Sequence, residues 1–365
     1  MITFIPLAHY YSVYVHVCLF LVLANLIHAY TLDIDDPKNI SFLRSVGYIL
    51  LFLSIFYLGL RPISGMYFGD MGTYSRYFNG YAYGEPVNVD KDFAFHYYMK
   101  FVSNFTTVHG FFFLTEFLYI IPMYLISKIH FKEYWFYSFF MFLVSFSFYT
   151  YGVNGIRNGV ATSMFLWGLC YQNKKWLMIL FFVLAALFHK TLLLPVMAYV
   201  VTLFYNNPKV YIKTWLLCIP LSFVIGGALI SLFTILGFGD DRLAAYLSDN
   251  TSVENVGKTG FRWDFIFYSS FAVFTGWYFI IKKKFEDVFY HQIYGVYLIC
   301  NSFWILVIRA NFSNRFAYLS WFLMAIIIIY PFLKKQFFEA QEVVIAKVVV
   351  AYFSFTYLMW LVYYG

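Results

Sequence analysis

The chain has few charged residues and lacks the common motifs for binding a nucleotide or zinc and for a nucleophilic serine. Charged residues make up 12% of its 365 residues, whereas soluble domains are usually about one-quarter charged. The four cysteines lie far apart in apolar stretches, without C-x-x-C or Cys/His spacing, so neither a zinc site nor a disulfide framework is expected. No G-x-x-x-x-G-K-S/T, H-E-x-x-H or G-x-S-x-G motif occurs. We therefore expect no metal, no cofactor and no nucleotide-binding domain.

What the chain has instead is apolar sequence: hydrophobic residues make up 62% and the mean hydropathy is +0.70. Long apolar stretches recur along the chain. Two of them, residues 175–188 and 191–206, are short, so they are either tilted or include one re-entrant segment. The sequence predicts an all-α, polytopic integral membrane protein of about twelve transmembrane helices, forming a single transmembrane domain over residues 1–365. The predicted spans are residues 4–29, 42–60, 107–128, 134–150, 156–172, 175–188, 191–206, 211–237, 264–281, 288–308, 314–333 and 344–363.

Lysines and arginines are distributed differently between the predicted spans. Thirteen of the seventeen lysines fall in every second connection, which the positive-inside rule assigns to the cytoplasm. The net charge of +7 follows from these lysines and gives no reason to expect a nucleic-acid partner. Seven of the eight arginines fall in or beside the other connections, which include two larger outer-face loops at 61–106 and 238–263. Arginines on the outer face depart from the positive-inside rule, and an anionic ligand on that face is the simplest explanation.

The first polar motif is residues 69–78 (GDMGTYSRYF), directly after the second predicted span. Asp70, Tyr74 and Tyr77 are spaced for one face of a helix, and Arg76 lies among them. An interfacial turn with ordinary aromatic anchors would have the same pattern. The residues that follow are polar and then amphipathic, which suits an outer loop lying on the membrane.

The second motif is residues 151–161 (YGVNGIRNGVA), which opens the fifth predicted span from outside. Free backbone N–H groups and the helix dipole favour an anion at a helix start, and Arg157 adds a bidentate donor beside Asn158. Snorkelling of Arg157 to the membrane surface is the alternative. A charged residue at the start of a span should have a partner.

The third motif is residues 188–191 (FHKT), in which His189 lies between two apolar stretches and could transfer a proton near neutral pH. It could equally be the polar tip of a helical hairpin. Glu116, inside the third predicted span, is an ionisable group of the kind that is functional by default, but the sequence does not name its partner.

The fourth motif is residues 309–318 (RANFSNRFAY), across a short connection late in the chain. Arg309 and Arg315 would repel each other there unless an anion lay between them, which predicts phosphate or pyrophosphate binding. Arg315 and Tyr318 are three residues apart and share a helix face. The loop at 238–263, with Asp241 and Arg242, is either an ordinary solvated loop or a sugar-binding lid.

These motifs resemble those of the EpsG/Wzy group of bacterial polysaccharide polymerases. The resemblance rests on Asp70 to Tyr77, on residues 155–161 (GIRNGVA), and on residues 189–191 followed by 315–318 (RFAY). The family usually has Arg-Gln at the position of Arg157-Asn158, and His-Ser or a near variant at 189–190. The order of the motifs between the spans also fits.

The resemblance implies a GT-C-like architecture in the bacterial inner membrane, with the active site facing the periplasm. It implies joining of oligosaccharide repeat units for O-antigen, capsule or exopolysaccharide. The growing glycan would leave one undecaprenyl pyrophosphate and pass to a sugar of another lipid-linked unit, and a chain-length regulator protein is a further expected partner. Since the substrate arrives already activated, no nucleotide domain is needed.

In this interpretation Arg157 and Arg315 hold the pyrophosphate, assisted by Arg309 or Arg76. His189 is the first choice for the general base and Asp70 the second. Sugar contacts would come from polar side chains of the four motifs and the second outer loop, namely Tyr74, Asn158, Tyr318, Asp241 and Arg242.

Two other functions remain open from the sequence. One is an O-antigen ligase or another GT-C enzyme that uses a lipid-linked sugar. The other is a flippase for lipid-linked oligosaccharide, which should distribute its cations through a cavity open to both faces. The gathering of arginines on one face, and the absence of a visible repeat, favour an enzyme.

Overall fold

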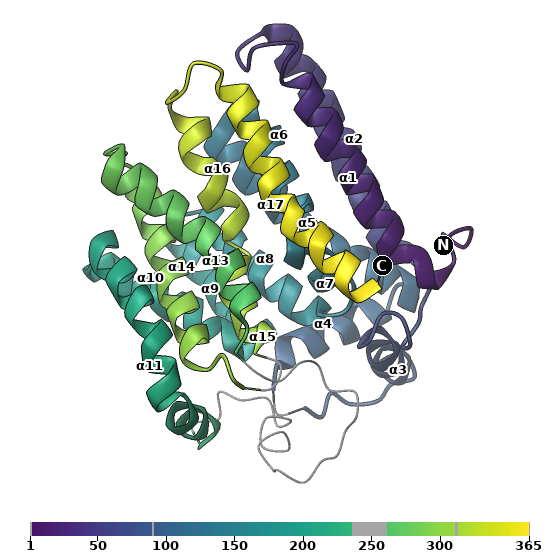
Figure 1. Cartoon of the computed structure of the whole chain (residues 1–365). Coiled ribbons are helices and arrows are strands. Elements are labelled where there is room, and N and C mark those ends of the chain that lie inside the picture. The colour runs from purple at the N-terminus through teal and green to yellow at the C-terminus, as the bar shows by residue number, and fades with distance from the viewer. Residues whose placement is uncertain (1, 90, 236–260, 311–312, 365) are drawn as a thin grey trace. The chain divides into compact units, whose positions relative to one another are not determined.

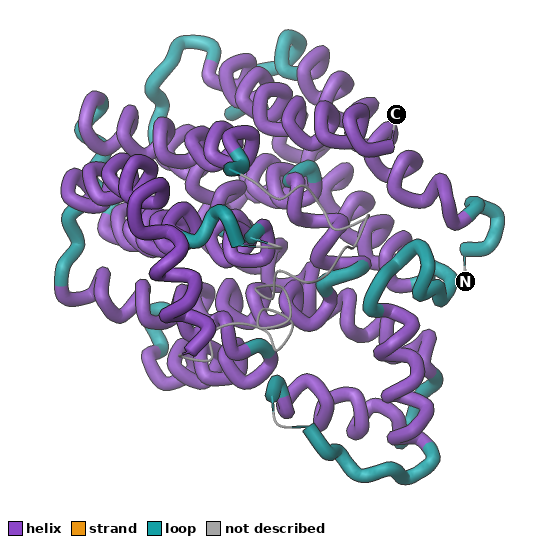
Figure 2. Tube along the Cα trace, turned by 60° about the horizontal axis from the view of Figure 1, so that its bottom comes forward, coloured by secondary structure: helices purple, strands orange, loops and turns teal. Residues whose placement is uncertain are grey.

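The computed structural model describes residues 2–89, 91–235, 261–310 and 313–364, and within these ranges all regular structure is helical (Figures 1 and 2). The chain divides into two compact units, one made of Met1–Lys190 with Ile329–Gly365 and the other of Thr191–Ile328. We call them unit 1 and unit 2. The prediction of an all-α protein is confirmed.

Unit 1 contains ten of the described α-helices and the second half of another, α16 (Met324–Lys334). The ten are α1 (Tyr10–His28), α2 (Pro37–Gly59), α3 (Met71–Ala82), α4 (Phe93–Ser103), α5 (Val108–Phe131), α6 (Trp135–Leu143), α7 (Phe146–Val153), α8 (Ile156–Cys170), α9 (Lys175–Phe188) and α17 (Gln341–Tyr364). Short 3-10 turns lie at η1 (Leu7–His9), η2 (Lys132–Tyr134) and η3 (Lys190–Leu192).

Unit 2 is built around α14 (Val288–Leu306), which packs on its neighbours on several sides. The neighbours are α10 (Leu193–Phe204), α11 (Pro208–Ile235), α13 (Trp263–Gly276) with its π-helical continuation η4 (Trp277–Lys282), and α15 (Asn314–Trp321). Asn301 of α14 is fully buried and joins these helices by hydrogen bonds. Its Oδ1 accepts from Trp215 Nε1 at 2.7 Å, and its Nδ2 donates to Ser320 Oγ at 2.9 Å.

The described residues include seven helical segments that are long and apolar enough to cross a membrane, so the protein is a polytopic membrane protein. They are Leu7–His28, Pro37–Gly59, Val108–Leu143, Pro208–Gly226, Trp263–Lys282, Asn314–Lys334 and Gln341–Tyr364. As far as their residues are described, the twelve predicted apolar stretches fall on helices, but several of these helices are short. For example, α8 has 15 residues and a length of about 22 Å, less than the roughly 30 Å of a bilayer core. Twelve spans and a GT-C arrangement therefore stay predictions.

Within unit 1, α5 is the central helix and packs on α2, α6 and α8. Interhelical hydrogen bonds hold it there: Ser163 of α8 donates to Tyr119 O at 2.6 Å, and Ser127 donates to Ser138 of α6 at 2.9 Å. Such small polar side chains let apolar helices approach closely, since lipid gives no hydrophobic drive for helices to associate.

The connections of unit 1 gather at two opposite ends. Tyr134 donates to the carboxylate of Asp35, and Lys334 Nζ lies 5.9 Å from the Phe131 ring centroid, so the connections at 29–36, 132–134 and 335–340 share one end. We call this the lysine end. Arg61 contacts Val153 O at the other, which we call the arginine end. Both chain termini lie toward the arginine end, where the Tyr11 and Tyr364 rings are 5.0 Å apart (Figure 1). This grouping matches the alternation of lysines in the sequence.

Candidate functional site

At the arginine end, the first two sequence motifs meet. The Asp70 N–H donates to Asn154 Oδ1 at 3.1 Å, although the two residues are 84 positions apart. Gly69 makes this contact possible, because its φ is +52° and an added Cβ would lie only 2.0 Å from Asn154 Oδ1. Asp70 is the N-cap residue of α3, with its side chain partly exposed and making no cap hydrogen bond.

The second and third motifs meet through one carboxylate, that of Asp92. Asp92 Oδ2 lies 2.9 Å from Arg157 Nη1, and Asp92 Oδ1 accepts the Lys190 N–H at 2.9 Å. Arg157 is the second residue of α8, and Lys190 follows His189, the C-cap residue of α9. The carboxylate is thus the charged partner expected for Arg157 at the start of α8.

A histidine lies close to this ion pair. His96, on the buried face of α4, shares a hydrogen bond between its Nδ1 and the Tyr81 hydroxyl at 2.9 Å. Burial lowers the pKa of His96, the positive charge of Arg157 lowers it further, and Asp92 opposes both. These effects favour the neutral form of the His96 imidazole. Tyr77 of α3 packs edge-on against the same ring, with centroids 5.1 Å apart.

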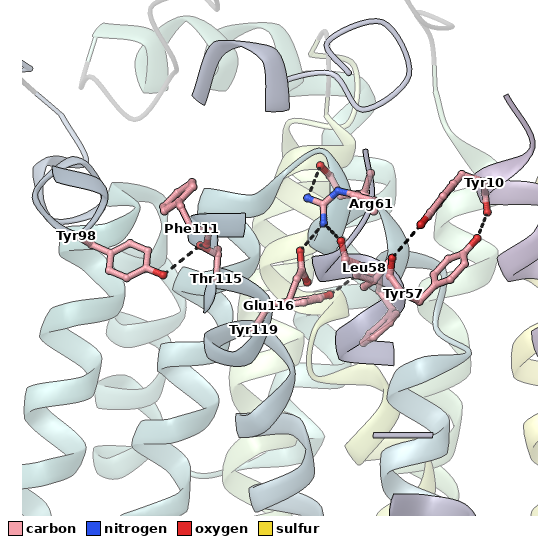
Figure 3. A network of polar contacts seen from close by, with 11 residues as sticks. Tyr10, Tyr57, Leu58, Arg61, Tyr98, Phe111, Thr115, Glu116 and Tyr119 are labelled. Atoms are coloured by element: carbon pink, nitrogen blue, oxygen red, sulfur yellow. Dashed lines mark hydrogen bonds and ion pairs between the residues drawn. The ribbon is translucent and has the colours of Figure 1, made fainter. Parts of the chain in front are cut away.

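A second ion pair lies deeper, between Arg61 and Glu116 (Figure 3). Arg61 Nη1 is 2.8 Å from Glu116 Oε1, and both side chains are almost completely buried. Arg61 also donates to Leu58 O, at the end of α2, and to Val153 O at 3.5 Å, at the end of α7. Within the described residues, Arg61 Nε and Glu116 Oε2 have no hydrogen-bond partner. Through these contacts the pair connects α2, α5 and α7, directly before the turn at residues 154–157.

The other predicted residues of unit 1 differ in exposure. Tyr74 is buried against Phe95 of α4, with ring centroids 5.2 Å apart, so it packs in the core, whereas Tyr77 on the same helix is partly exposed. Arg76 is exposed, and its Nη2 lies 3.5 Å from Thr73 Oγ1. Asn158 is half-buried, and within the described part of the chain its Oδ1 accepts no hydrogen bond.

The fourth motif belongs to unit 2. Arg309 and Arg315 are both exposed, and the Arg309 guanidinium lies 5.0 Å from the Phe223 ring centroid. Tyr318 is buried and packs on Trp321, with centroids 5.3 Å apart, and it lies three residues after Arg315 on α15. Asp241 and Arg242 lie outside the described residues. No group of three His, Cys, Asp or Glu side chains among the residues described could hold a metal ion.

A model of the EpsG family matches residues 45–365, which include all four motifs. The chain belongs to the EpsG family. The EpsG family contains Wzy-type polymerases, and the resemblance stated from the motifs is thereby confirmed. No curated protein and no solved structure matched the chain.

Two contributions to this EpsG-family site were missed from the sequence. Asp92 was read only as part of a polar stretch, and the signal that could have found it is an acidic residue directly before an amphipathic segment in an outer loop. Arg61 is one of the seven arginines that the sequence places in or beside the outer connections, and only the structure shows that its side chain is buried against Glu116. In both ion pairs, Asp92 with Arg157 and Glu116 with Arg61, the two partners lie far apart in the sequence.

Proposed function

We propose that this EpsG-family protein is a Wzy-type polysaccharide polymerase of the bacterial inner membrane. It would transfer a growing glycan from undecaprenyl pyrophosphate to a lipid-linked repeat unit at the periplasmic face. The observation that carries the proposal is the junction at Asp92, which brings Arg157 of the second motif to the His189–Lys190 segment of the third. A cationic group and a proton acceptor side by side are what such a transfer needs.

In the proposed reaction, the acceptor hydroxyl oxygen bonds to the anomeric carbon of the donor while the bond from that carbon to the pyrophosphate oxygen breaks. The pyrophosphate leaves with the electron pair, and the hydroxyl proton passes to a base, for which His189 is the first choice and Asp70 the second. Arg157 stabilises the charge that develops on the leaving group. A guanidinium has five N–H donors, so Asp92 can orient it while other donors bind phosphate.

The exposed arginines of unit 2 are the second part of the proposal. Arg315 and Arg309 of unit 2, and Arg76 of α3, are each proposed to contact the pyrophosphate of a lipid-linked substrate, as their motifs imply. Exposure suits such a role, because an incoming anion can reach these side chains. Asn158, which follows Arg157 on α8 and is half-buried, is proposed to contribute a sugar contact.

Complementation of a deletion strain tests the proposal, with surface glycan displayed as a ladder of chain lengths. Arg157→Ala and Arg315→Ala should each leave only single repeat units while the protein still inserts normally. Arg157→Lys should also fail, since a lysine cannot make bidentate contacts. Arg44→Ala is the matched control, because Arg44 is exposed on α2 toward the lysine end. Wild-type chain lengths in both the Arg157→Ala and Arg315→Ala strains would refute the pyrophosphate assignment.

The deletion strain itself separates the alternatives. Loss of a polymerase leaves surface lipid capped with one repeat unit. Loss of a ligase instead accumulates long chains still attached to undecaprenyl pyrophosphate, and loss of a flippase traps repeat units on the cytoplasmic leaflet.

A further inference from the structure

One face of α4 exposes a row of aromatic side chains. They recur every four residues, so they lie one above the other along the helix and just beyond its end. Each is between 44% and 66% exposed: Phe93, Tyr97, Phe101 and Phe105. We call this row the aromatic stripe. The rings of Phe101 and Phe105 are in contact, with centroids 5.3 Å apart.

The opposite face of α4 is packed inside unit 1. It contacts Tyr74 of α3, Phe188 of α9 and Thr115 of α5, the last through a 3.1 Å hydrogen bond from the Tyr98 hydroxyl (Figure 3). The helix is therefore apolar on both faces, although the described residues cover only one of them. A soluble surface rarely leaves such a row open to water.

The position of α4 in the chain indicates what covers the stripe. Only four residues separate its last residue, Ser103, from Val108, where a membrane-spanning segment begins. The five Cα–Cα steps from Ser103 to Val108 can extend over at most about 18 Å, so the end of α4 lies within that distance of the start of α5. Aromatic side chains are enriched at this depth, where lipid tails meet head groups.

We propose that α4 is an interfacial helix whose aromatic stripe lies in bilayer lipid, and that it thereby sets the height of Arg157 relative to the membrane surface. Asp92 directly precedes α4 and holds the Arg157 guanidinium at 2.9 Å. The carboxylate is held from both oxygens, since its Oδ1 also accepts the Lys190 N–H at 2.9 Å. The second half of this inference rests on the proposed function, since the height matters only if Arg157 binds a lipid-linked phosphate.

Photocrosslinking tests the contact with lipid without depending on activity. p-Benzoylphenylalanine is placed at Tyr97 or at Phe101, one aromatic ring for another, in protein reconstituted into phosphatidylethanolamine and phosphatidylglycerol vesicles. Irradiation should add the mass of one phospholipid at either position. At Asn88, an exposed residue of the loop before α4, it should not. Crosslinking only within the protein or to a second copy would overturn the proposal, and so would reaction with solvent alone.

Cysteine variants provide a second measurement of the same contact. In protein whose four native cysteines are replaced by alanine, Phe101→Cys labelled with a nitrobenzoxadiazole dye should be quenched by nitroxide lipids and not by aqueous iodide. Asn88→Cys should show the reverse. Iodide quenching at position 101, or shielding from both quenchers, would show that lipid does not cover the stripe.

The consequence for the site is tested separately from the contact. Tyr97→Asp combined with Phe101→Asp should shorten the glycan ladder severalfold and raise the KM for lipid-linked substrate more than it lowers kcat. Tyr97→Leu with Phe101→Leu should retain both values. Lipid crosslinks together with unchanged kinetics in the Asp variant would refute the coupling to Arg157. If Arg157→Ala polymerises normally while the crosslinks form, the proposed function fails and the interfacial helix stands.

Discussion

Removing either partner of the Arg61–Glu116 pair should destabilise the protein more than removing both. The two side chains are 0% and 1% exposed, so Glu116→Leu leaves the Arg61 charge buried with only two carbonyl oxygens, those of Leu58 and Val153. Breaking a buried ion pair in this way costs about 3–5 kcal/mol of unfolding free energy. Since 1.4 kcal/mol is a factor of ten, the folded-to-unfolded ratio should fall roughly a hundredfold to several-thousandfold.

The double variant Arg61→Leu with Glu116→Leu removes both charges at once. It also removes the Nε and Oε2 atoms that have no hydrogen-bond partner among the described residues. Replacing a whole buried ion pair by apolar side chains is often neutral. We therefore expect the double variant to lose less unfolding free energy than either single variant, with a coupling energy of about 3 kcal/mol or more.

Unfolding in mixed micelles with a rising mole fraction of sodium dodecyl sulfate, followed by circular dichroism, measures these differences. The Arg262–Asp264 pair of unit 2 is the matched control. Its atoms are 2.7 Å apart, but its side chains are 17% and 34% exposed, so Asp264→Leu should cost less than about 1 kcal/mol. If the double variant loses as much as the sum of the two singles, the buried charges do not stabilise each other and the reasoning is refuted.

Two further predictions concern the arginine end. Gly69→Ala should destabilise more than Gly84→Ala in the same micelle assay: both positions have positive φ, which costs about 1–2 kcal/mol for alanine, but only at Gly69 would the new Cβ collide, at 2.0 Å from Asn154 Oδ1. Equal losses would show that the Asn154 contact does not matter. Because burial and then Arg157 lower the pKa of His96, the unfolded chain binds the proton more readily, so thermal stability should fall as pH drops below about 6.5. His96→Gln should flatten that dependence in melting curves between about pH 5 and 7, and an unchanged slope would contradict the assignment.

The contact with Asp92 changes the interpretation of Arg157. The sequence suggested an open anion site at the start of α8, whereas the structure fills part of it with Asp92. An arginine already held by a carboxylate is oriented in advance, which reduces the entropy lost when a phosphate binds. The same carboxylate also weakens the attraction for phosphate, because it reduces the net positive charge at Arg157.

The sequence by itself determined that the chain is helical and lies in a membrane, because apolar length is a local property that any long helix displays. Within the described ranges the twelve apolar stretches fall on helices, although α6 and α7 divide one of them at Val144–Ser145. The short motifs were also sufficient to recognise the family. Alternation of lysines predicted which connections of unit 1 lie at the same end, since each span reverses the direction of the chain.

Only the tertiary structure decided which polar residues act together. Glu116 pairs with Arg61 over 55 positions, and Asp92 reaches Lys190 over 98. Spacing along one helix cannot reveal such partners, since they depend on how separate helices pack. The same limit applies to Tyr318, because its spacing from Arg315 could not reveal that its ring is buried against Trp321. The motifs indicated the arginine, and the fold supplied the carboxylate that holds it.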